Sequence, residues 1–421
     1  MYENAYLTRE LPGIGGEIKA EPADFRVTEV PLYPAIGEGE HVYAEIEKRG
    51  MTTFDLVERI SRALRVPDRA IGYAGLKDSR AITRQVISIH AVDTEAVEKL
   101  SIPNTRVHWV RRHRNKLRIG HLKGNRFRIR VRDVVPDAAE RCQPILDYLV
   151  EHGVPNAFGV QRFGSRRDAH RIGRALCLDD AKGAVQRIVG RPSRFEHNRA
   201  VVEAREKFEA GELEEALRLF PRPYATERAL VAGLLESGGR YELAVRRIPK
   251  KMRRLYIAAF QSHLFNMTLW RRLDSFGRLL PGDLAYKHAN GAVFAVSETM
   301  DFNDLERRLD EFDISPSGPL HGYKMTQPIG APRVIEEEVL RDEGFDPEAF
   351  LAPMRVARIK GERRALRIPL IDAKIEPEDE DLEGTLVVSF ELPRGSYATI
   401  VMREIMKAGD DSILLGDSHS D

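Results

Sequence analysis

The chain has 421 residues, of which 42% are hydrophobic and 31% are charged, which is typical of a globular protein of roughly two or three domains. Its formal net charge is only +1, so the composition implies no bulk attraction to polyanions. No apolar run approaches the length of a membrane span, and residues 1–16 lack the basic-then-apolar pattern of a signal peptide.

The two cysteines, Cys142 and Cys177, form neither a CxxC pair nor a Cys/His cluster at zinc spacing. This usage is typical of a reduced intracellular protein. We therefore expect a cytoplasmic protein with no structural metal and no membrane partner.

The first predicted elements are strands and a helix. Residues 12–16 are rich in glycine, but no strand precedes them and no long helix follows, so we predict a turn and not a dinucleotide-binding loop. Alternating apolar side chains predict strands around Phe25 and over 41–46. Apolar residues at helical spacing predict a helix over 54–66, which Thr52 or Thr53 can cap.

A polar, glycine-punctuated loop over 72–85 separates that helix from a predicted strand at 86–89. In this loop Asp78 stands among Lys77, Arg80 and Arg84. A nearby opposite charge favours the ionised form of a carboxylate, and an ionised carboxylate can act as a nucleophile. These residues alone leave open a plain alternative, an aspartate that starts a turn and is neutralised by its neighbours.

The most basic region runs from residue 106 to residue 132, with no acidic residue before Asp133. Within it the segment 126–132 alternates strictly, so a strand would place its arginines on one face and Phe127 on the other. Such density predicts contacts with nucleic-acid phosphates. The alternative is a solvated basic edge that discourages strand pairing. Acidic residues gather instead at 336–338 and 376–383. We therefore predict that positive and negative charges lie on separate parts of the surface, one of which can attract RNA.

The second half is predicted to be largely helical. A helix over 138–151, kinked or restarted at Pro144, ends at Gly153, where we place a domain boundary. A loop over 156–164 precedes mostly helical sequence over 166–219 and a longer helix over 253–273, whose Gln261, His263 and Asn266 need buried partners.

The remaining elements are short. Strands are predicted over 284–287 and 293–296, a loop over 315–322, and a second boundary near 350–355. A strand over 386–392 leads to a helix over 397–407 that Ser396 can cap, and the polar tail 410–421 is predicted to fray.

Several separate motifs, in this order, resemble one family, the TruD-type pseudouridine synthases, which isomerise a uridine in tRNA. The resemblance covers nearly the whole chain. One departure is Ala157, where that family usually has an aromatic residue. The motifs are Lys19-Ala20-Glu21-Pro22-x-Asp24-Phe25, Ala74-Gly75-Leu76-Lys77-Asp78-x-x-Ala81-x-Thr83-x-Gln85, Gly124-Asn125-x-Phe127, Pro155-Asn156-x-Phe158-Gly159-x-Gln161-Arg162-Phe163-Gly164, Gln261-Ser262-x-Leu264-Phe265-Asn266 and Leu392-Pro393-x-Gly395-Ser396-Tyr397-Ala398-Thr399.

The resemblance implies roles for particular residues. Asp78 matches the catalytic aspartate, and Lys19, which by its surroundings alone is an ordinary exposed lysine, matches the lysine that pairs with it. Phe127 matches the aromatic that stacks on the target base, and Asn125 a neighbouring polar residue of the active site. The RNA-binding candidates are Arg80, Arg84, Arg126, Arg128, Arg130, Gln161, Arg162 and Phe163.

The resemblance also implies an α/β fold of the α+β kind, with a mixed, largely antiparallel sheet flanked by helices and an inserted second α/β domain. We expect a catalytic domain formed by 1–155 and 353–421 around an insertion at 156–352. The implied function is a tRNA pseudouridine synthase, acting at position 13, that needs no cofactor or metal and works as a monomer. The alternatives are a non-catalytic tRNA-binding protein or RNA chaperone, and an RNA methyltransferase, against which the lack of a glycine-rich cofactor loop counts.

Overall fold

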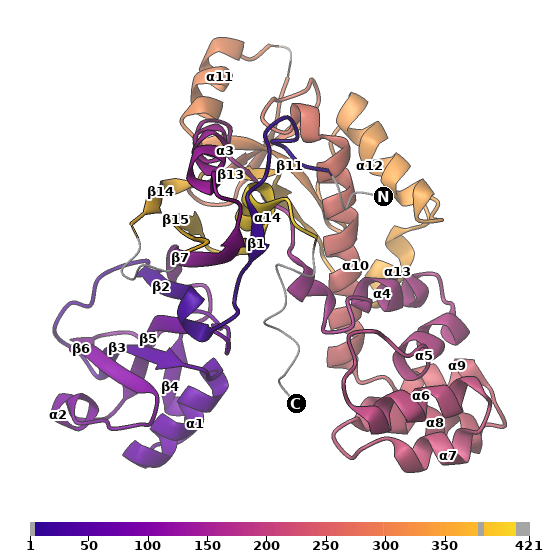
Figure 1. Cartoon of the computed structure of the whole chain (residues 1–421). Coiled ribbons are helices and arrows are strands. Elements are labelled where there is room, and N and C mark those ends of the chain that lie inside the picture. Colours follow the sequence, from indigo (N-terminus) through magenta and orange to yellow (C-terminus); the bar gives the residue numbers. More distant parts are fainter. Residues whose placement is uncertain (1–4, 298, 378–382, 410–421) are drawn as a thin grey trace. The chain divides into compact units, whose positions relative to one another are not determined.

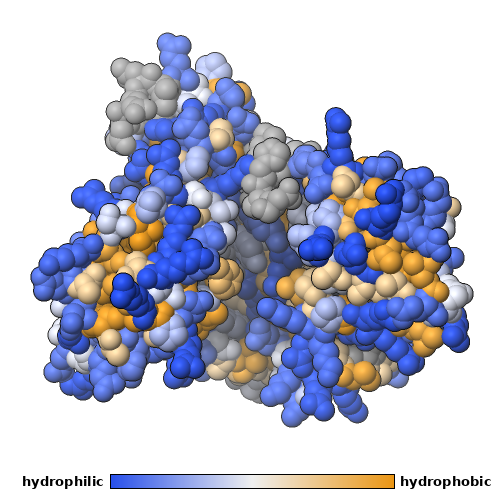
Figure 2. All heavy atoms as spheres, turned by 90° about the horizontal axis from the view of Figure 1, so that it is seen from below, coloured by the Kyte–Doolittle hydropathy of each residue, from blue (hydrophilic) through white to orange (hydrophobic). Residues whose placement is uncertain are grey.

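The computed structural model describes residues 5–297, 299–377 and 383–409, so the predicted tail at 410–421 lies outside the described residues. The chain divides into two compact units. We call Tyr6–Val154, together with the chain from Ile368 on, the sheet unit, and Pro155–Arg367 the helical unit. On the face drawn in Figure 2, hydrophilic residues cover most of the surface and hydrophobic residues form patches between them.

A nine-stranded sheet organises the sheet unit (Figure 1). Seven strands run in the order β14-β15-β7-β2-β5-β3-β6, while β1 pairs with β7 and β4 pairs with β5. Within the described part of this sheet only β2 and β5 pair in parallel, which confirms the predicted mixed, largely antiparallel sheet. The strands are β1 (Gly15–Glu17), β2 (Phe25–Pro31), β3 (His41–Arg49), β4 (Ile71–Tyr73), β5 (Ile82–His90), β6 (Thr105–His113), β7 (Leu122–Val134), β14 (Ile371–Glu376) and β15 (Thr385–Pro393).

Helices cover one face of β3 and β5. Helix α1 (Thr53–Leu64) and the short α2 (Thr94–Glu98) bury an apolar cluster that includes Ile46, Leu56 and Ile87. Thr52 is the cap of α1, because its Oγ1 accepts from the Asp55 N–H while the Asp55 carboxylate accepts from Thr52 N–H. The register places Phe127 on this same face, opposite Val27, which in turn lies beside Thr83. We call it the α1 face.

The opposite face carries the arginines of β7. Buried and more exposed residues alternate along β7, with Phe127, Ile129 and Val131 buried between arginines. The predicted alternation is therefore confirmed, and we call this second face the arginine face. Two further helices complete the sheet unit, α3 (Ala138–His152), which continues through Pro144, and α14 (Ala398–Met406), in which all nine residues are buried.

Among the described residues, the helical unit contains ten α-helices and a four-stranded sheet in the order β10-β9-β11-β12. Helices α4 to α9 pack around a separate apolar core that includes Val185, Phe208 and Leu234. The elements are α4 (Ala169–Cys177), α5 (Ala181–Val189), α6 (Arg199–Glu209), α7 (Leu213–Leu219), α8 (Ala225–Glu236), α9 (Tyr241–Ala244), α10 (Lys250–Arg271), α11 (Phe302–Asp310), α12 (Gly330–Asp342), α13 (Leu351–Val356), β9 (Leu284–Lys287), β10 (Val293–Ala295), β11 (Ile314–Leu320) and β12 (Glu362–Ala365).

Two predicted loops contain strand residues. The prediction of a loop over 315–322 was wrong, because its first residues belong to β11. Pro316 lies opposite β9 and Pro319 lies opposite β12, so the two prolines flank the point where β11 changes partner. Prolines are tolerated at such irregular positions of a sheet. In the predicted loop at 72–85, β5 already begins at Ile82, so Thr83 and Gln85 point from a strand. The second junction between units follows Arg367, since the pairing of β12 with β11 holds residues 362–365 in the helical unit.

Candidate active site

The loop between β4 and β5 that carries Asp78 is held by α1 and β5. The Lys77 N–H donates to Thr53 Oγ1 at 2.9 Å, and that hydroxyl donates to Gln85 Oε1 at 3.1 Å. Thr52 thus caps the helix while Thr53, the next residue, binds the loop. Asp78 consequently lies on the α1 face, beside the start of α1.

The carboxylate of Asp78 is paired with the side chain of Lys19. Lys19 Nζ lies 3.2 Å from Asp78 Oδ2, and the two side chains are 1% and 53% exposed. The Lys19 ammonium also lies over the ring of Phe25, 4.7 Å from its centroid. Lys19 has a φ of 63°, a left-handed conformation that is uncommon for lysine. A buried cation therefore meets a carboxylate that remains open to a substrate.

A second buried lysine, Lys48, holds the backbone of the same loop. Its Nζ donates to the carbonyl oxygens of Asp78, at 3.1 Å, and Met51. Burial lowers the pKa of Lys48 to about 8; the charge of Asp78 opposes this shift and that of Lys77 adds to it. Lys48 therefore places a second positive charge near the carboxylate and fixes the loop conformation.

Lys77 turns away from Asp78 toward Glu29 and Asn125. Its Nζ lies 3.1 Å from Glu29 Oε2 and donates to Asn125 Oδ1 at 2.5 Å. Burial raises the pKa of Glu29, while the Lys77 ammonium opposes that shift. Asn125 is thus joined to the Asp78 loop through Lys77.

The position of Glu29 follows from the sheet. Strands β2 and β4 pair with the same edge of β5, β2 at residues 82–84 and β4 at residues 87–89. The Val86 N–H lies between these two pairings, and it donates to Glu29 Oε1 at 3.4 Å. The carboxylate therefore closes a gap in the sheet directly behind the Asp78 loop.

Phe127 forms part of an aromatic floor on the α1 face. It is 7% exposed, and its ring centroid lies 6.1 Å from that of Phe25 and 5.6 Å from that of Phe390. The Phe25 ring contacts both the ammonium of Lys19 and the ring of Phe127, so it links these two residues.

Gly124 lets β7 approach β15 closely, because a Cβ there would lie 2.3 Å from the carbonyl oxygen of Leu392.

The arginine candidates of the sheet lie on the other face. Arg84 donates to Glu47 at 2.8 Å, and Arg128 donates to Glu376 at 2.9 Å. Arg126 lies 3.4 Å from Glu391, and Arg130 lies 3.6 Å from Asp24. The structure does not bring these four arginines to Asp78; each has a carboxylate partner instead. Three of them, Arg84, Arg126 and Arg128, line a groove of about 700 Å³. Its lining also includes Arg26, Lys374 and Asp372.

The remaining candidates are placed as follows. Arg80 is half-buried in the Asp78 loop. In the helical unit, Gln161, Arg162 and Phe163 form a 3-10 turn, where Arg162 donates to Ser262 at 2.9 Å and the Phe163 ring packs edge-on to His170. These three residues belong to the helical unit, whereas Asp78 belongs to the sheet unit.

The polar residues of the long helix find the partners that burial requires. Gln261 donates to the carbonyl of His321, and His263 Nε2 lies 2.8 Å from Glu343 Oε1. Asn266 exchanges two hydrogen bonds with the backbone of Phe158, at 2.8 and 2.9 Å. These contacts order the loop at 156–164 from within.

Glu29 and Lys48 were not predicted to belong to the site. Glu29 and Lys48 are charged residues in otherwise alternating strands, which place them on the buried α1 face. A charge at a core-facing strand position was the signal that could have identified them. Thr53 was named only as a possible cap.

Among the described residues, no group of three or more His, Cys, Asp and Glu side chains is placed to hold a metal ion. Cys142 and Cys177 are free and buried, and burial raises the pKa of each thiol to about 12. No helix in the described ranges is long and apolar enough to cross a membrane.

Comparison with known proteins gives a consistent result. The family model described as tRNA pseudouridine synthase D (TruD) matches residues 2–405. The chain belongs to the TruD family. It is similar to the tRNA pseudouridine synthase D of Geobacter sulfurreducens, with 46% identity over 96% of this chain and 97% of that one, and of Geobacter metallireducens, with 47% identity over 97% and 98%.

A solved structure extends the comparison to the fold. The putative TruD of Methanosarcina mazei aligns with a TM-score of 0.84 and 31% identity, covering 97% of both chains. The TruD protein of Thermus thermophilus shares 37% identity over 96% of this chain and 92% of its own. Membership of the TruD family confirms the resemblance found in the motifs and the predicted fold class.

Proposed function

We propose that this protein converts a uridine of tRNA to pseudouridine, with Asp78 as the catalytic carboxylate. The observation that carries the proposal is the half-exposed Asp78 carboxylate beside the buried ammonium of Lys19, 3.2 Å away. Membership of the TruD family supports tRNA as the substrate. Tyr6–Val154 and the chain from Ile368 on would form the catalytic domain, and Pro155–Arg367 the inserted one.

The reaction is an isomerisation. The bond between N1 of uracil and C1′ of the ribose breaks, the base turns over, and a bond forms between C5 and C1′. The proton on C5 is released and N1 takes up a proton, so atoms and electrons balance without a cofactor. Attack of the carboxylate on C1′ and removal of a sugar proton to give a glycal both require Asp78 to be ionised. The ammonium of Lys19 lies 3.2 Å from that carboxylate as its counter-ion.

The surrounding residues suit the other demands of the reaction. The base must leave the RNA stack, at a cost of a few kcal/mol. The floor formed by Phe25, Phe127 and Phe390 offers the detached base an apolar surface. Asn125, held by Lys77, offers an amide for the polar edge of uracil. The loop is rigidly held, which favours one geometry between carboxylate and ribose.

We further propose that the uridine at position 13 reacts, that the enzyme is a monomer and that it acts in the cytoplasm. The test is release of tritium from tRNA transcripts that carry 5-tritiated uridine, since C5 loses its hydrogen in the reaction. A transcript with cytidine at position 13 should release none. Binding of tRNA without any release would leave a non-catalytic tRNA-binding protein or RNA chaperone and end the proposal. Light scattering of the purified protein tests the monomer.

A further inference from the structure

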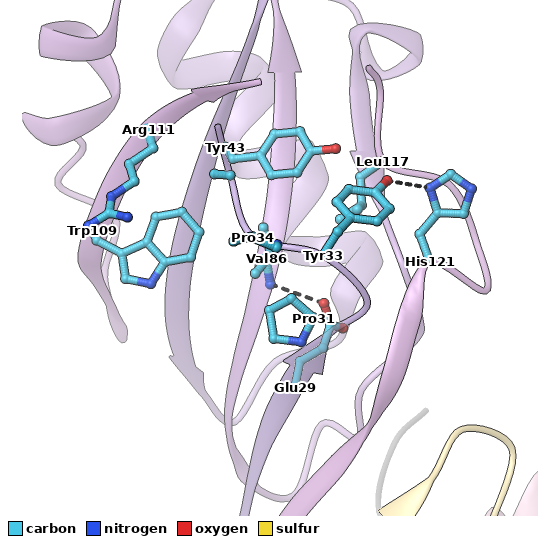
Figure 3. Close-up of a pocket in the computed structure, with 11 residues that line it drawn as sticks. Glu29, Pro31, Tyr33, Pro34, Tyr43, Val86, Trp109, Arg111, Leu117 and His121 are labelled. Carbon is cyan, nitrogen blue, oxygen red and sulfur yellow. Dashed lines mark hydrogen bonds between the residues drawn. The ribbon is translucent and has the colours of Figure 1, made fainter. Parts of the chain in front are cut away.

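A small aromatic pocket lies mostly on the arginine face, and Glu29, the partner of Lys77 in the Asp78 loop, forms part of its wall. Its volume is about 310 Å³, and it is lined by Glu29, Pro31, Tyr33, Pro34, Ala35, Tyr43, Val86, Trp109, Arg111, Leu117 and His121. Trp109 and Arg111 of β6 pair with Glu45 and Tyr43 of β3, which point away from α1. In Figure 3, Trp109 and Arg111 lie on one side of the pocket and Tyr33 and His121 on the other.

The pocket is built from ordered contacts. The Tyr33 hydroxyl lies 2.8 Å from His121 Nδ1, the dashed line at the right of Figure 3, and the Tyr33 ring stacks on His113 at a centroid distance of 5.2 Å. Tyr43 donates to the carbonyl of Asn115 at 2.9 Å. These bonds fix the aromatic walls, so binding costs little further ordering entropy.

The size and chemistry of the pocket fit one nucleobase. A volume of 310 Å³ is at the small end of ligand pockets and suits a single small ring system. Tyrosine, tryptophan and histidine rings are the surfaces on which proteins stack unpaired RNA bases. The hydroxyl of Tyr33 and the ring of His121 supply polar atoms at the wall.

The rim of the pocket is cationic and partly apolar. Arg111 is exposed, and none of the described residues forms an ion pair with it, or with the exposed Arg118 that follows the lining residue Leu117 in the chain. Such cations are available to phosphates. Leu32, between the lining residues Pro31 and Tyr33, is 52% exposed, and Ile119, midway between the lining residues Leu117 and His121, is 72% exposed, as expected for a surface that is covered when occupied.

We propose that this pocket binds one unstacked nucleotide of the tRNA substrate, distinct from the uridine that reacts at Asp78. The base enters between Trp109 and Tyr33, and Arg111 contacts its phosphate. This inference rests on the proposed function for its substrate. The cationic rim favours a nucleotide over an uncharged apolar partner, and the occupant anchors tRNA without taking part in the chemistry.

The test uses the pocket-filling variant Ala35→Phe and the rim variant Arg111→Ala in the full chain. Ala35→Ser, which keeps the pocket open, and Arg62→Ala, an exposed arginine of α1, are the matched controls. Removal of one base stack should weaken tRNA affinity by roughly 5- to 100-fold. The rate of pseudouridine formation at saturating tRNA should stay near that of the wild type, so KM changes and kcat does not.

A fluorescence readout locates the contact. The chain has two tryptophans, so Trp270→Phe leaves Trp109 as the sole reporter. Binding of tRNA should quench its emission, and Ala35→Phe should abolish the quenching. Wild-type affinity and kinetics in both pocket variants would overturn the proposal. Quenching by uridine or adenosine monophosphate without any effect of Ala35→Phe on tRNA affinity would assign the pocket to a free nucleotide instead.

A different result would contradict the proposed function and leave the pocket proposal intact. If the wild-type protein forms no pseudouridine yet Trp109 is quenched by tRNA in a manner that depends on Ala35, the pocket stands and the activity does not. Retained folding of Ala35→Phe is checked by its thermal unfolding. Because Arg111 is exposed, its replacement carries no such risk.

Discussion

Lys19 Nζ lies 3.2 Å from Asp78 Oδ2 although the two residues are 59 positions apart in the chain. The lysine side chain is almost fully buried and the carboxylate is half exposed. A buried ammonium is costly without an opposite charge, so the pair fixes the direction in which the carboxylate points. This relationship leads to several predictions about the site.

Asp78→Asn should abolish isomerisation and leave tRNA binding nearly intact, because the change removes charge but keeps the shape of the side chain. Tritium release and a filter-binding assay measure the two effects. Asp68→Asn, at an exposed position, is the control that should behave as wild type. Release by Asp78→Asn at the wild-type rate would exclude this carboxylate as the catalyst.

Lys19→Met should slow the reaction, because methionine keeps the length of the side chain but removes the ammonium that pairs with the Asp78 carboxylate and fixes its direction. Lys19→Arg, which keeps the positive charge, should retain more activity than Lys19→Met. The measurement is kcat/KM for both variants, and wild-type activity of Lys19→Met would leave Lys19 with only a structural role.

Lys48 should make the enzyme lose activity above about pH 8. Its pKa of about 8 in the folded protein means that the positive charge near Asp78 disappears as pH rises through that value. The same shift sets the sign of a stability effect. The folded pKa is below the unfolded value of 10.5, so the burial cost of the charged form is present below pH 8 and is relieved as pH rises toward 10.5.

Lys48→Arg tests this assignment, because a guanidinium stays protonated throughout that range. The falling limb of its pH profile should move to higher pH. Its stability should lack the gain between pH 8 and 10.5 that the wild type shows, as measured by urea unfolding. An unmoved limb would mean that another group controls activity there.

Glu29→Gln should destabilise the protein by about 3–5 kcal/mol, since it leaves the buried ammonium of Lys77 without its carboxylate. Activity should fall as well, because Lys77 holds Asn125 beside the Asp78 loop. The double change Glu29→Gln with Lys77→Met should recover much of the stability, as unfolding measurements would reveal. Additive losses in the double variant would show that the two residues do not act as a pair.

The arginines of β7 should contribute little to the salt dependence of tRNA binding. Arg128 and Arg130 already have carboxylate partners, so replacing both should leave the slope of log K against log salt nearly unchanged. Replacing Arg118 and Lys123 should reduce the slope by roughly 0.7–0.9 for each phosphate that these cations neutralise in the wild type. A reduced slope in the Arg128 and Arg130 variant would show that these two arginines contact RNA phosphates despite their carboxylate partners.

Local sequence patterns were sufficient to predict much of the sheet unit. Strict alternation over 126–132 predicted β7 and the opposite orientations of Phe127 and Arg128, because side chains alternate along any strand. The ordered motifs around Asp78, Asn125 and Phe127 indicated the family, since each motif is local in sequence. The capping of α1 was also predictable, from Thr52 and its relation to Asp55.

Only the tertiary structure decided which charged side chains pair with one another. Lys77, Arg80 and Arg84 are the neighbours of Asp78 in sequence, yet Lys19 and Lys48 contact it and Lys77 pairs with Glu29. The antiparallel pairing of β3 with β5 brings Lys48 to the Asp78 loop, and the parallel pairing of β2 with β5 brings Glu29 there. Likewise, pairing of β7 with β15 and β14 with β15 places acidic side chains beside the arginines that the sequence displayed as unpaired. Electrostatic partners depend on distances of a few ångströms between segments far apart in the chain, and strand register, which no local pattern encodes, sets those distances.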